Sequence, residues 1–180
     1  MIYSYLLVTD NGSAPCVQQN ILSLAICKPR IRKAAKVGDY IIAFSSKSMK
    51  ISQNAKIIYI AKITNKLKLN KYYPEYKNRK DCIYDNNLTL IKNNYHNNCN
   101  IEKDINGKYV LISNEFIYFG NNFINVPQKI KNMIPKYQGH MSKKNIEYET
   151  AFLNEFNILQ KKYGLGIKGQ PIHSIKKNTC

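Results

Sequence analysis

The sequence CKPRIRKAAKVGDYIIAFSSK, from Cys27 to Lys47, decides the fold prediction together with KIIYIAKIT at positions 56–64. Residues 30–35 can form one or two helical turns after a proline, and a Gly-Asp turn then leads into a strand at 40–45. A polar loop at 46–54 separates this strand from a second one at 57–64. The segment carries five basic residues before its first acidic residue, Asp39. Strands beside such concentrated positive charge favour an anionic partner, with nucleic acid as the first candidate.

Further strands are predicted on both sides of this segment. Four β-rich apolar runs occupy residues 2–9, 21–27, 109–113 and 115–119. A helix is predicted at 145–163, because apolar side chains recur there at spacings of 4, 4, 3 and 4 residues along one face. Asn145 can cap the start of this helix, and Gly164 can end it.

The order of these elements predicts an α+β fold. Strands cluster without regular alternation with helices, which favours a mixed, strongly curved sheet or a small barrel with flanking helices. The length of 180 residues predicts a single domain over 1–180. Residues 66–100 have little periodicity and are interpreted as an insertion. The polar tail at 168–180 is expected to be flexible, or to dock through Pro171-Ile172.

Composition limits the class of protein. There are 28 Lys and Arg residues against 11 Asp and Glu, which gives a net charge of +17, and 44% of the chain is hydrophobic. This charge predicts binding of polyanions at low salt, although a coding bias toward Lys, Asn, Ile and Tyr is an alternative explanation. No apolar run approaches the ~20 residues of a membrane helix. The first ten residues lack the features of a signal peptide.

The cysteines and the absent motifs exclude several kinds of site. The five cysteines are odd in number and have no CxxC spacing, which argues against a zinc site and a secreted disulfide framework. A cytoplasmic location is therefore expected. The sequence has no P-loop, Rossmann fingerprint, HExxH motif or deaminase signature. We expect no cofactor and no metal.

Several segments, taken in order, resemble a known family. They are DNGSAP at 10–15, LAICKPRIR at 24–32, VGDY at 37–40, YVLIS at 109–113, FIYFG at 116–120 and GHMS at 139–142. This ordered set is similar to Nucleotide modification associated domain 2, found in phage and bacterial gene neighbourhoods linked to DNA base modification. The likeness covers nearly the whole chain and matches least at 66–100. It implies a context of DNA modification rather than a particular reaction.

A second resemblance concerns architecture alone. The Gly-Asp turn between strands, followed by a strand that ends near Tyr72-Tyr73, is similar to the EVE, ASCH and YTH branch of the PUA-like folds. That resemblance implies a basic groove and an aromatic pocket that bind RNA or a flipped, modified base. We therefore predict a module that reads a base in a pocket, with DNA ahead of RNA as partner. The alternatives are an enzyme acting on a nucleotide or modified base, and a basic accessory subunit of a DNA-modifying enzyme.

The candidate binding residues combine charge, hydrogen-bonding groups and aromatic rings. They are Asp10, Gly12, Lys28, Arg30, Arg32, Ser45, Ser46, Lys47, Tyr72, Tyr73, Tyr118 and His140. Basic side chains and strand-end hydroxyls suit phosphate, a carboxylate suits the edge of a base, and tyrosines can stack on it.

Three of the side chains also suit catalysis, and each has a structural alternative. His140 and Asp10 can act as acid-base partners, or they can cap a helix and form an Asx turn, respectively. Cys27 is a candidate nucleophile if the basic residues that follow lower its thiol pKa, and otherwise a buried small hydrophobe.

Overall fold

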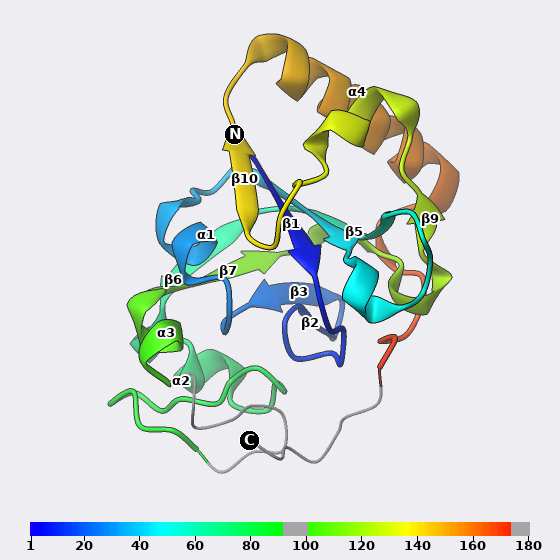
Figure 1. Cartoon of the computed structure of the whole chain (residues 1–180). Coiled ribbons are helices and arrows are strands. Elements are labelled where there is room, and N and C mark those ends of the chain that lie inside the picture. Colours follow the sequence, from blue (N-terminus) through cyan, green and yellow to red (C-terminus); the bar gives the residue numbers. More distant parts are fainter. Residues whose placement is uncertain (92–100, 174–180) are drawn as a thin grey trace.

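Two β-sheets stack between helical layers in the computed structural model, which describes residues 1–91 and 101–173 (Figure 1). Helix α4 (Ile146–Tyr163) covers the outer face of the larger sheet, and α2 (Tyr73–Tyr76) and α3 (Ile101–Asn106) lie beyond the smaller sheet. The α+β prediction is confirmed. The barrel alternative is wrong, because neither sheet of the described residues closes on itself.

The larger sheet is mixed and has the order β10-β1-β4-β5-β8-β11, with β9 also paired to β5. The strands are β1 (Ile2–Leu7), β4 (Tyr40–Ser45), β5 (Lys56–Lys62), β8 (Glu115–Tyr118), β9 (Ile124–Asn125), β10 (His140–Lys143) and β11 (Gly166–Ile167). The β1–β4 and β8–β11 pairs are parallel, and the other pairs are antiparallel. The predicted strands at 2–9, 40–45, 57–64 and 115–119 correspond to β1, β4, β5 and β8.

The smaller sheet is antiparallel and has the order β2-β3-β7-β6. Its strands are β2 (Cys16–Gln18), β3 (Ile21–Leu24), β6 (Asn65–Lys68) and β7 (Tyr109–Ser113). Gln19 and Asn20, with φ of 51° and 57°, connect β2 to β3. Two consecutive positive φ angles are typical of the type I′ turns that close two-residue hairpins.

Short helices and one long helix complete the chain. The short elements are α1 (Pro29–Ala34), η1 (Lys47–Met49), η2 (Leu69–Lys71), η4 (Gly120–Asn122) and η5 (Gln128–Met133). Helix α4 begins after Asn145, whose side chain accepts a hydrogen bond from the backbone N–H of Tyr148 at 3.2 Å. Gly164 ends it with φ of 72°, as the sequence predicts.

Alternation along the strands divides the core into three layers. Odd-numbered residues of β1, such as Tyr3, Tyr5 and Leu7, pack between the two sheets. Ile2 faces the other way, toward the apolar stripe of α4. A third cluster lies between the smaller sheet and residues 69–90, so most of the predicted insertion is packed structure. Its residues 92–100 lie outside the described residues.

A bulge changes the alternation in β5. Ala43 pairs with Tyr59 and Phe44 pairs with Ile57, so Ile58 is an extra residue opposite β4. Ile58 and Tyr59 therefore both face the smaller sheet. Bulges of this kind re-aim side chains. Here the bulge directs the Tyr59 hydroxyl toward that of Tyr5, with an oxygen–oxygen distance of 2.9 Å.

Candidate functional site

A groove lies where the parallel strands β1 and β4 end, and residues of η1 (cyan in Figure 1) form part of its lining. Ligands of open sheets commonly bind outside the carboxyl ends of parallel strands. The cavity volume is about 540 Å³. We call it the β1–β4 groove, and its lining is Leu6, Val8, Ser45, Ser46, Lys47, Ser48, Ser52, Gln53, Asn54, Ala55, Ile134, Pro135, Lys136 and Gln138.

Three predicted binding residues, Ser45, Ser46 and Lys47, lie together in this groove. The Ser46 amide donates to the carbonyl of Leu7 at 2.9 Å, which continues the β1–β4 ladder past the end of β4. The Ser45 hydroxyl accepts from the Lys56 amide at 2.9 Å and is buried, so its first role is to hold the start of β5. Lys47 is exposed and free to meet a ligand.

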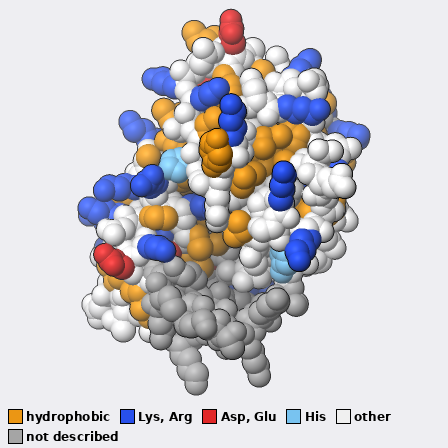
Figure 2. Space-filling view, viewed as in Figure 1, with side chains coloured by type: hydrophobic (Ala, Val, Ile, Leu, Met, Phe, Trp, Pro, Cys, Tyr) orange, Lys and Arg blue, Asp and Glu red, His pale blue; other side chains and the backbone are white. Residues whose placement is uncertain are grey.

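The groove combines an apolar floor with a polar, basic rim. Leu6, Val8, Ile134 and Pro135 supply apolar groups, and Lys136 adds a second exposed ammonium to that of Lys47. Figure 2 shows Lys and Arg side chains spread over this face, with few acidic ones. Such a surface can hold a planar apolar ring on its floor and an anion at its rim.

Asp10 lies beneath the surface between the sheets. Its side chain is buried and accepts a hydrogen bond from the Tyr118 hydroxyl at 2.7 Å. Burial raises the pKa of the Asp10 carboxyl, and the Tyr118 hydroxyl is the strongest of the contacts that oppose this shift. The structure thus joins two predicted site residues, Asp10 and Tyr118, but places both inside the protein.

Residues near the C-terminal end of the described chain cover Asp10. The Asp10 amide donates to Nδ1 of His173 at 3.1 Å, and the His173 amide donates to the Asp10 carbonyl at 2.8 Å. Pro171 lies against Gly12, which has φ of 81° and leaves little room for a Cβ. Gly12 therefore serves the packing of this segment. Docking through Pro171-Ile172, one of the two predictions for the tail, is seen for the described part, and residues 174–180 lie outside it.

Lys28 and His140 lie close together at the edge of the larger sheet. The Lys28 ammonium is 4.3 Å from the ring centroid of Tyr5 and 3.4 Å from the carbonyl oxygen of Leu6. His140 pairs with Tyr5 across the β1–β10 ladder, so it is part of a strand and does not cap α4, whose cap is Asn145. Burial lowers the pKa of His140, and the positive charges of Arg30 and Lys28 lower it further.

Arg32 is a buried structural residue, which corrects its prediction as a phosphate contact. Its guanidinium donates to the carbonyls of Tyr109, Cys27 and Asp104 at 2.7, 3.2 and 2.7 Å. Arg30, by contrast, is exposed.

The chemistry of Cys27 also differs from the prediction. Burial and the nearby Asp104 raise the pKa of its thiol to about 11, which outweighs the opposing effect of Lys28 and Arg32. Because the thiolate is the nucleophile, this environment suits a structural cysteine better than a catalytic one.

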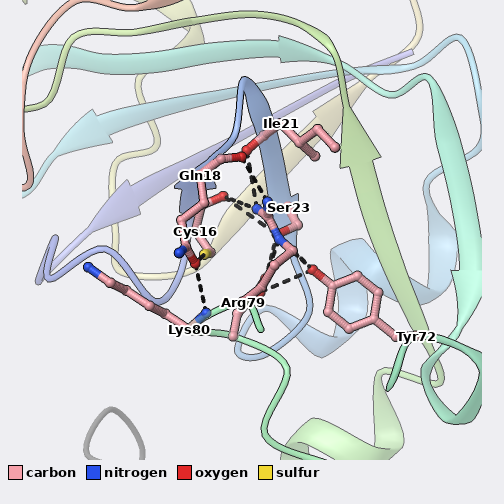
Figure 3. Close-up of polar contacts among 8 residues, drawn as sticks. Cys16, Gln18, Ile21, Ser23, Tyr72, Arg79 and Lys80 are labelled. Carbon is pink, nitrogen blue, oxygen red and sulfur yellow. Dashed lines mark hydrogen bonds and ion pairs between the residues drawn. The ribbon is translucent and has the colours of Figure 1, made fainter. Parts of the chain in front are cut away.

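Two of the three tyrosines predicted to stack on a base, Tyr72 and Tyr73, lie on the opposite side of the molecule from α4. Tyr72 is 1% exposed, and its hydroxyl contacts Ser23, Arg79 and Asp81 (Figure 3). Tyr73 is half-buried in the same layer. The β1–β4 groove is bordered instead by residues 134–138 near α4, so these tyrosines are not part of it.

Most of the groove lining was not predicted, and neither were several residues around it, among them Tyr5, Tyr59 and His173. Contacts between distant segments determine where these residues lie. Lys136, which lines the groove, had a local signal in the sequence for a place in the site, because it lies close to GHMS. Among the described residues, no group of three His, Cys, Asp or Glu side chains could hold a metal ion. No helix in this part of the chain is long and apolar enough to cross a membrane.

Comparison with known protein families identifies a family for this chain. The family model described as Nucleotide modification associated domain 2 matches residues 1–178. No curated protein and no solved structure matches the chain.

Proposed function

The chain belongs to the Nucleotide modification associated domain 2 family, and on this premise we propose that it binds nucleic acid or a modified nucleotide in the β1–β4 groove. The observation that carries the proposal is the pairing of an apolar floor with a basic rim at the ends of two parallel strands. A base can lie on Leu6, Val8 and Ile134, while Lys47 and Lys136 attract the phosphates. The net charge of +17 adds affinity that does not depend on base sequence.

Charge reversal in the groove tests this proposal. Lys47→Glu with Lys136→Glu removes both rim ammonium groups and repels phosphate. Lys71→Glu with Lys77→Glu is the matched control, because both side chains are exposed and lie beside α2, beyond the smaller sheet. The two double variants have the same net charge, so they differ only in where charge was reversed.

Affinity is measured by fluorescence anisotropy with labelled single-stranded and duplex DNA, with and without modified bases, over a salt series. We expect the groove variant to bind much more weakly than the control. Its slope of log affinity against log salt should fall by roughly 0.7 per lost phosphate contact on a single strand. Equal losses in the two variants would leave only general charge attraction and overturn the groove assignment.

A buried carboxyl with a raised pKa favours a second candidate, an enzyme acting on a nucleotide or modified base. Asp10 and Tyr118 form such a pair, and perturbed carboxyls are enriched at catalytic sites. Incubation with nucleotides and base-modified DNA, followed by mass spectrometry, tests it. Turnover that is lost in Asp10→Asn while DNA binding is retained would support the enzyme, and no turnover by the unaltered protein would exclude it for those substrates. The accessory role beside a DNA-modifying enzyme stays a prediction.

A further inference from the structure

Lys28 lies against the unpaired edge of β1, beside a residue that lines the β1–β4 groove. The β1–β10 ladder ends at the pair Tyr5 and His140. The next residue, Leu6, lines the groove, and its carbonyl oxygen lies 3.4 Å from the Lys28 ammonium. The ammonium therefore takes the place of the missing strand partner, and it lies on the Tyr5 side of β1, which faces the smaller sheet.

The backbone that carries Lys28 is strained. Cys27 and Lys28 have φ of 58° and 43°, in the left-handed region that side chains with a Cβ rarely adopt. Two such residues in succession persist only when their surroundings fix them, and such strain clusters at functional sites. Here the Cys27 amide donates to Oδ1 of Asp104 at 2.7 Å, and the Arg32 amide donates to the Lys28 carbonyl at 3.1 Å.

Arg32 and Asp104 form a rigid clamp behind this turn. The Arg32 guanidinium is fully buried, donates to the Cys27 carbonyl and lies 3.8 Å from Oδ1 of Asp104. A Cβ at Gly107 would overlap the guanidinium, so a glycine is needed behind it. Asp104 accepts from the Cys27 N–H and Arg32 donates to the Cys27 carbonyl. The two residues therefore fix the backbone from which the Lys28 side chain extends.

The Lys28 ammonium has no carboxylate counter-ion within the described residues. Burial lowers its pKa, as expected for a cation taken partly out of water. His140 lies on the same face of the ladder as Tyr5, beside Lys28, because directly paired residues point to the same side of a sheet. Lys28 is therefore a partly desolvated cation, held in a strained turn, and its ammonium can bind an anion.

We infer that a phosphate group of the groove ligand is the counter-ion of Lys28, bound at the free edge of β1 with His140 beside it, and that Arg32 and Asp104 position Lys28 for this contact. The inference rests on the proposed function and names the ligand chemistry of the groove. Phosphate fits because its oxygens can accept from an ammonium and an imidazole together. A nucleotide monophosphate and a nucleic-acid backbone both supply it.

The first experiment measures the phosphate contact. A labelled DNA single strand is bound to the full chain and displaced by deoxynucleoside monophosphates or by the corresponding nucleosides. Lys28→Ala should weaken DNA binding roughly ten- to a hundredfold, as expected for a lost charge-assisted hydrogen bond. It should also reduce the preference for monophosphates over nucleosides by a similar factor. The matched control is Lys33→Ala, which removes an exposed charge from α1, the helix that follows Lys28.

Displacement by monophosphates identifies a terminal phosphate as the bound group, whereas displacement only by longer strands identifies the backbone diester. A loss in Lys28→Ala no larger than in Lys33→Ala overturns the inference, even if the groove variant confirms nucleic-acid binding. Absence of DNA binding by the unaltered protein overturns both.

The second experiment tests the positioning role. Asp104→Asn keeps an oxygen for the Cys27 amide but removes the charge behind Arg32, and Arg32→Lys keeps the charge but loses the planar fork. Each variant should weaken the preference for monophosphates over nucleosides in the folded protein. Combined in a double variant with Lys28→Ala, neither should reduce this preference further. Additive losses in the double variants would mean that the clamp acts only on folding, and would overturn the positioning role. Thermal unfolding shows which variants are folded. If Arg32→Lys does not fold, Asp104→Asn alone tests the positioning role.

Discussion

Replacement of Arg79 by Met should destabilise the protein more than any exposed substitution. The guanidinium is buried and joins β2, β3 and the segment after α2 (Figure 3). It donates to the carbonyls of Cys16 at 3.0 Å, Gln18 at 2.9 Å and Ile21 at 3.2 Å, to the Ser23 hydroxyl at 2.8 Å and to the Tyr72 hydroxyl at 2.9 Å. The Asp81 carboxylate lies 3.6 Å from its Nε.

The size of the effect follows from what Arg79→Met leaves behind. Removal of one partner of a buried ion pair typically costs about 3–5 kcal/mol, because the other charge stays buried without compensation. The carbonyls that lose their donor each cost about 1–3 kcal/mol if water cannot reach them. Since β2 is an edge strand and water can reach part of it, we expect a total near the ion-pair range, ~3–5 kcal/mol.

Urea unfolding followed by circular dichroism measures the change. Arg30→Met is the control, because Arg30 is exposed and its loss should change stability by about 0.5 kcal/mol or less. Without Arg79, the pKa of Asp81 should rise further, and a raised carboxyl pKa lowers stability as pH increases. The defect should therefore be larger at about pH 7 than at about pH 5. A loss below ~1 kcal/mol, independent of pH, would refute a structural role for this network.

Three further predictions concern single residues. Burial raises the pKa of Asp10 above its ordinary value of about 3.9, so the folded chain keeps a proton that the unfolded chain releases, and stability falls as pH rises from about 4 toward 7. Asp10→Asn should reduce this decline in pH-dependent urea unfolding; an unchanged decline would argue against a raised pKa. Cys27, with a thiol pKa of about 11, should react with iodoacetamide near neutral pH far more slowly than in the unfolded chain, as measured by peptide mass spectrometry, and equal rates would contradict its burial. Asn145→Ala should destabilise by about 0.5–2 kcal/mol, while Asn145→Asp should be nearly neutral, because only Ala loses the acceptor for the Tyr148 amide; equal losses would argue against the cap.

Local signals in the sequence predicted most of the regular structure. The strand predicted at 40–45 has the same bounds as β4, and the helix predicted at 145–163 differs from α4 by its capping residue alone. Strands without a local pattern were missed. The sequence HMSK has little β character, and β10 exists because it pairs with β1. The same holds for β9 and β11, which are two residues long and depend on β5 and β8.

Burial of charged residues was the main limit on the site prediction. Arg30 and Arg32 look alike in sequence, yet one is exposed and the other is buried. The difference comes from Asp104 and Tyr109, which lie 72 and 77 residues away from Arg32. A basic residue on the inner face of a two-turn helix gives no local sign of such partners.

The groove was partly predictable because strand ends are visible in sequence, whereas its chemistry depends on how the strands pair. Ser46 and Lys47 follow an evident strand and do lie in the groove. The Lys28 ammonium meets the Leu6 carbonyl, next to the groove, only because β10 stops pairing at Tyr5 and leaves that carbonyl open. A β1–β10 ladder one residue longer would pair that carbonyl with a strand, and the Lys28 ammonium would lose its contact at this edge. The point at which the β1–β10 ladder ends therefore decides whether Lys28 can serve as a ligand contact or belongs to a solvated turn. This point has no local signal in the sequence.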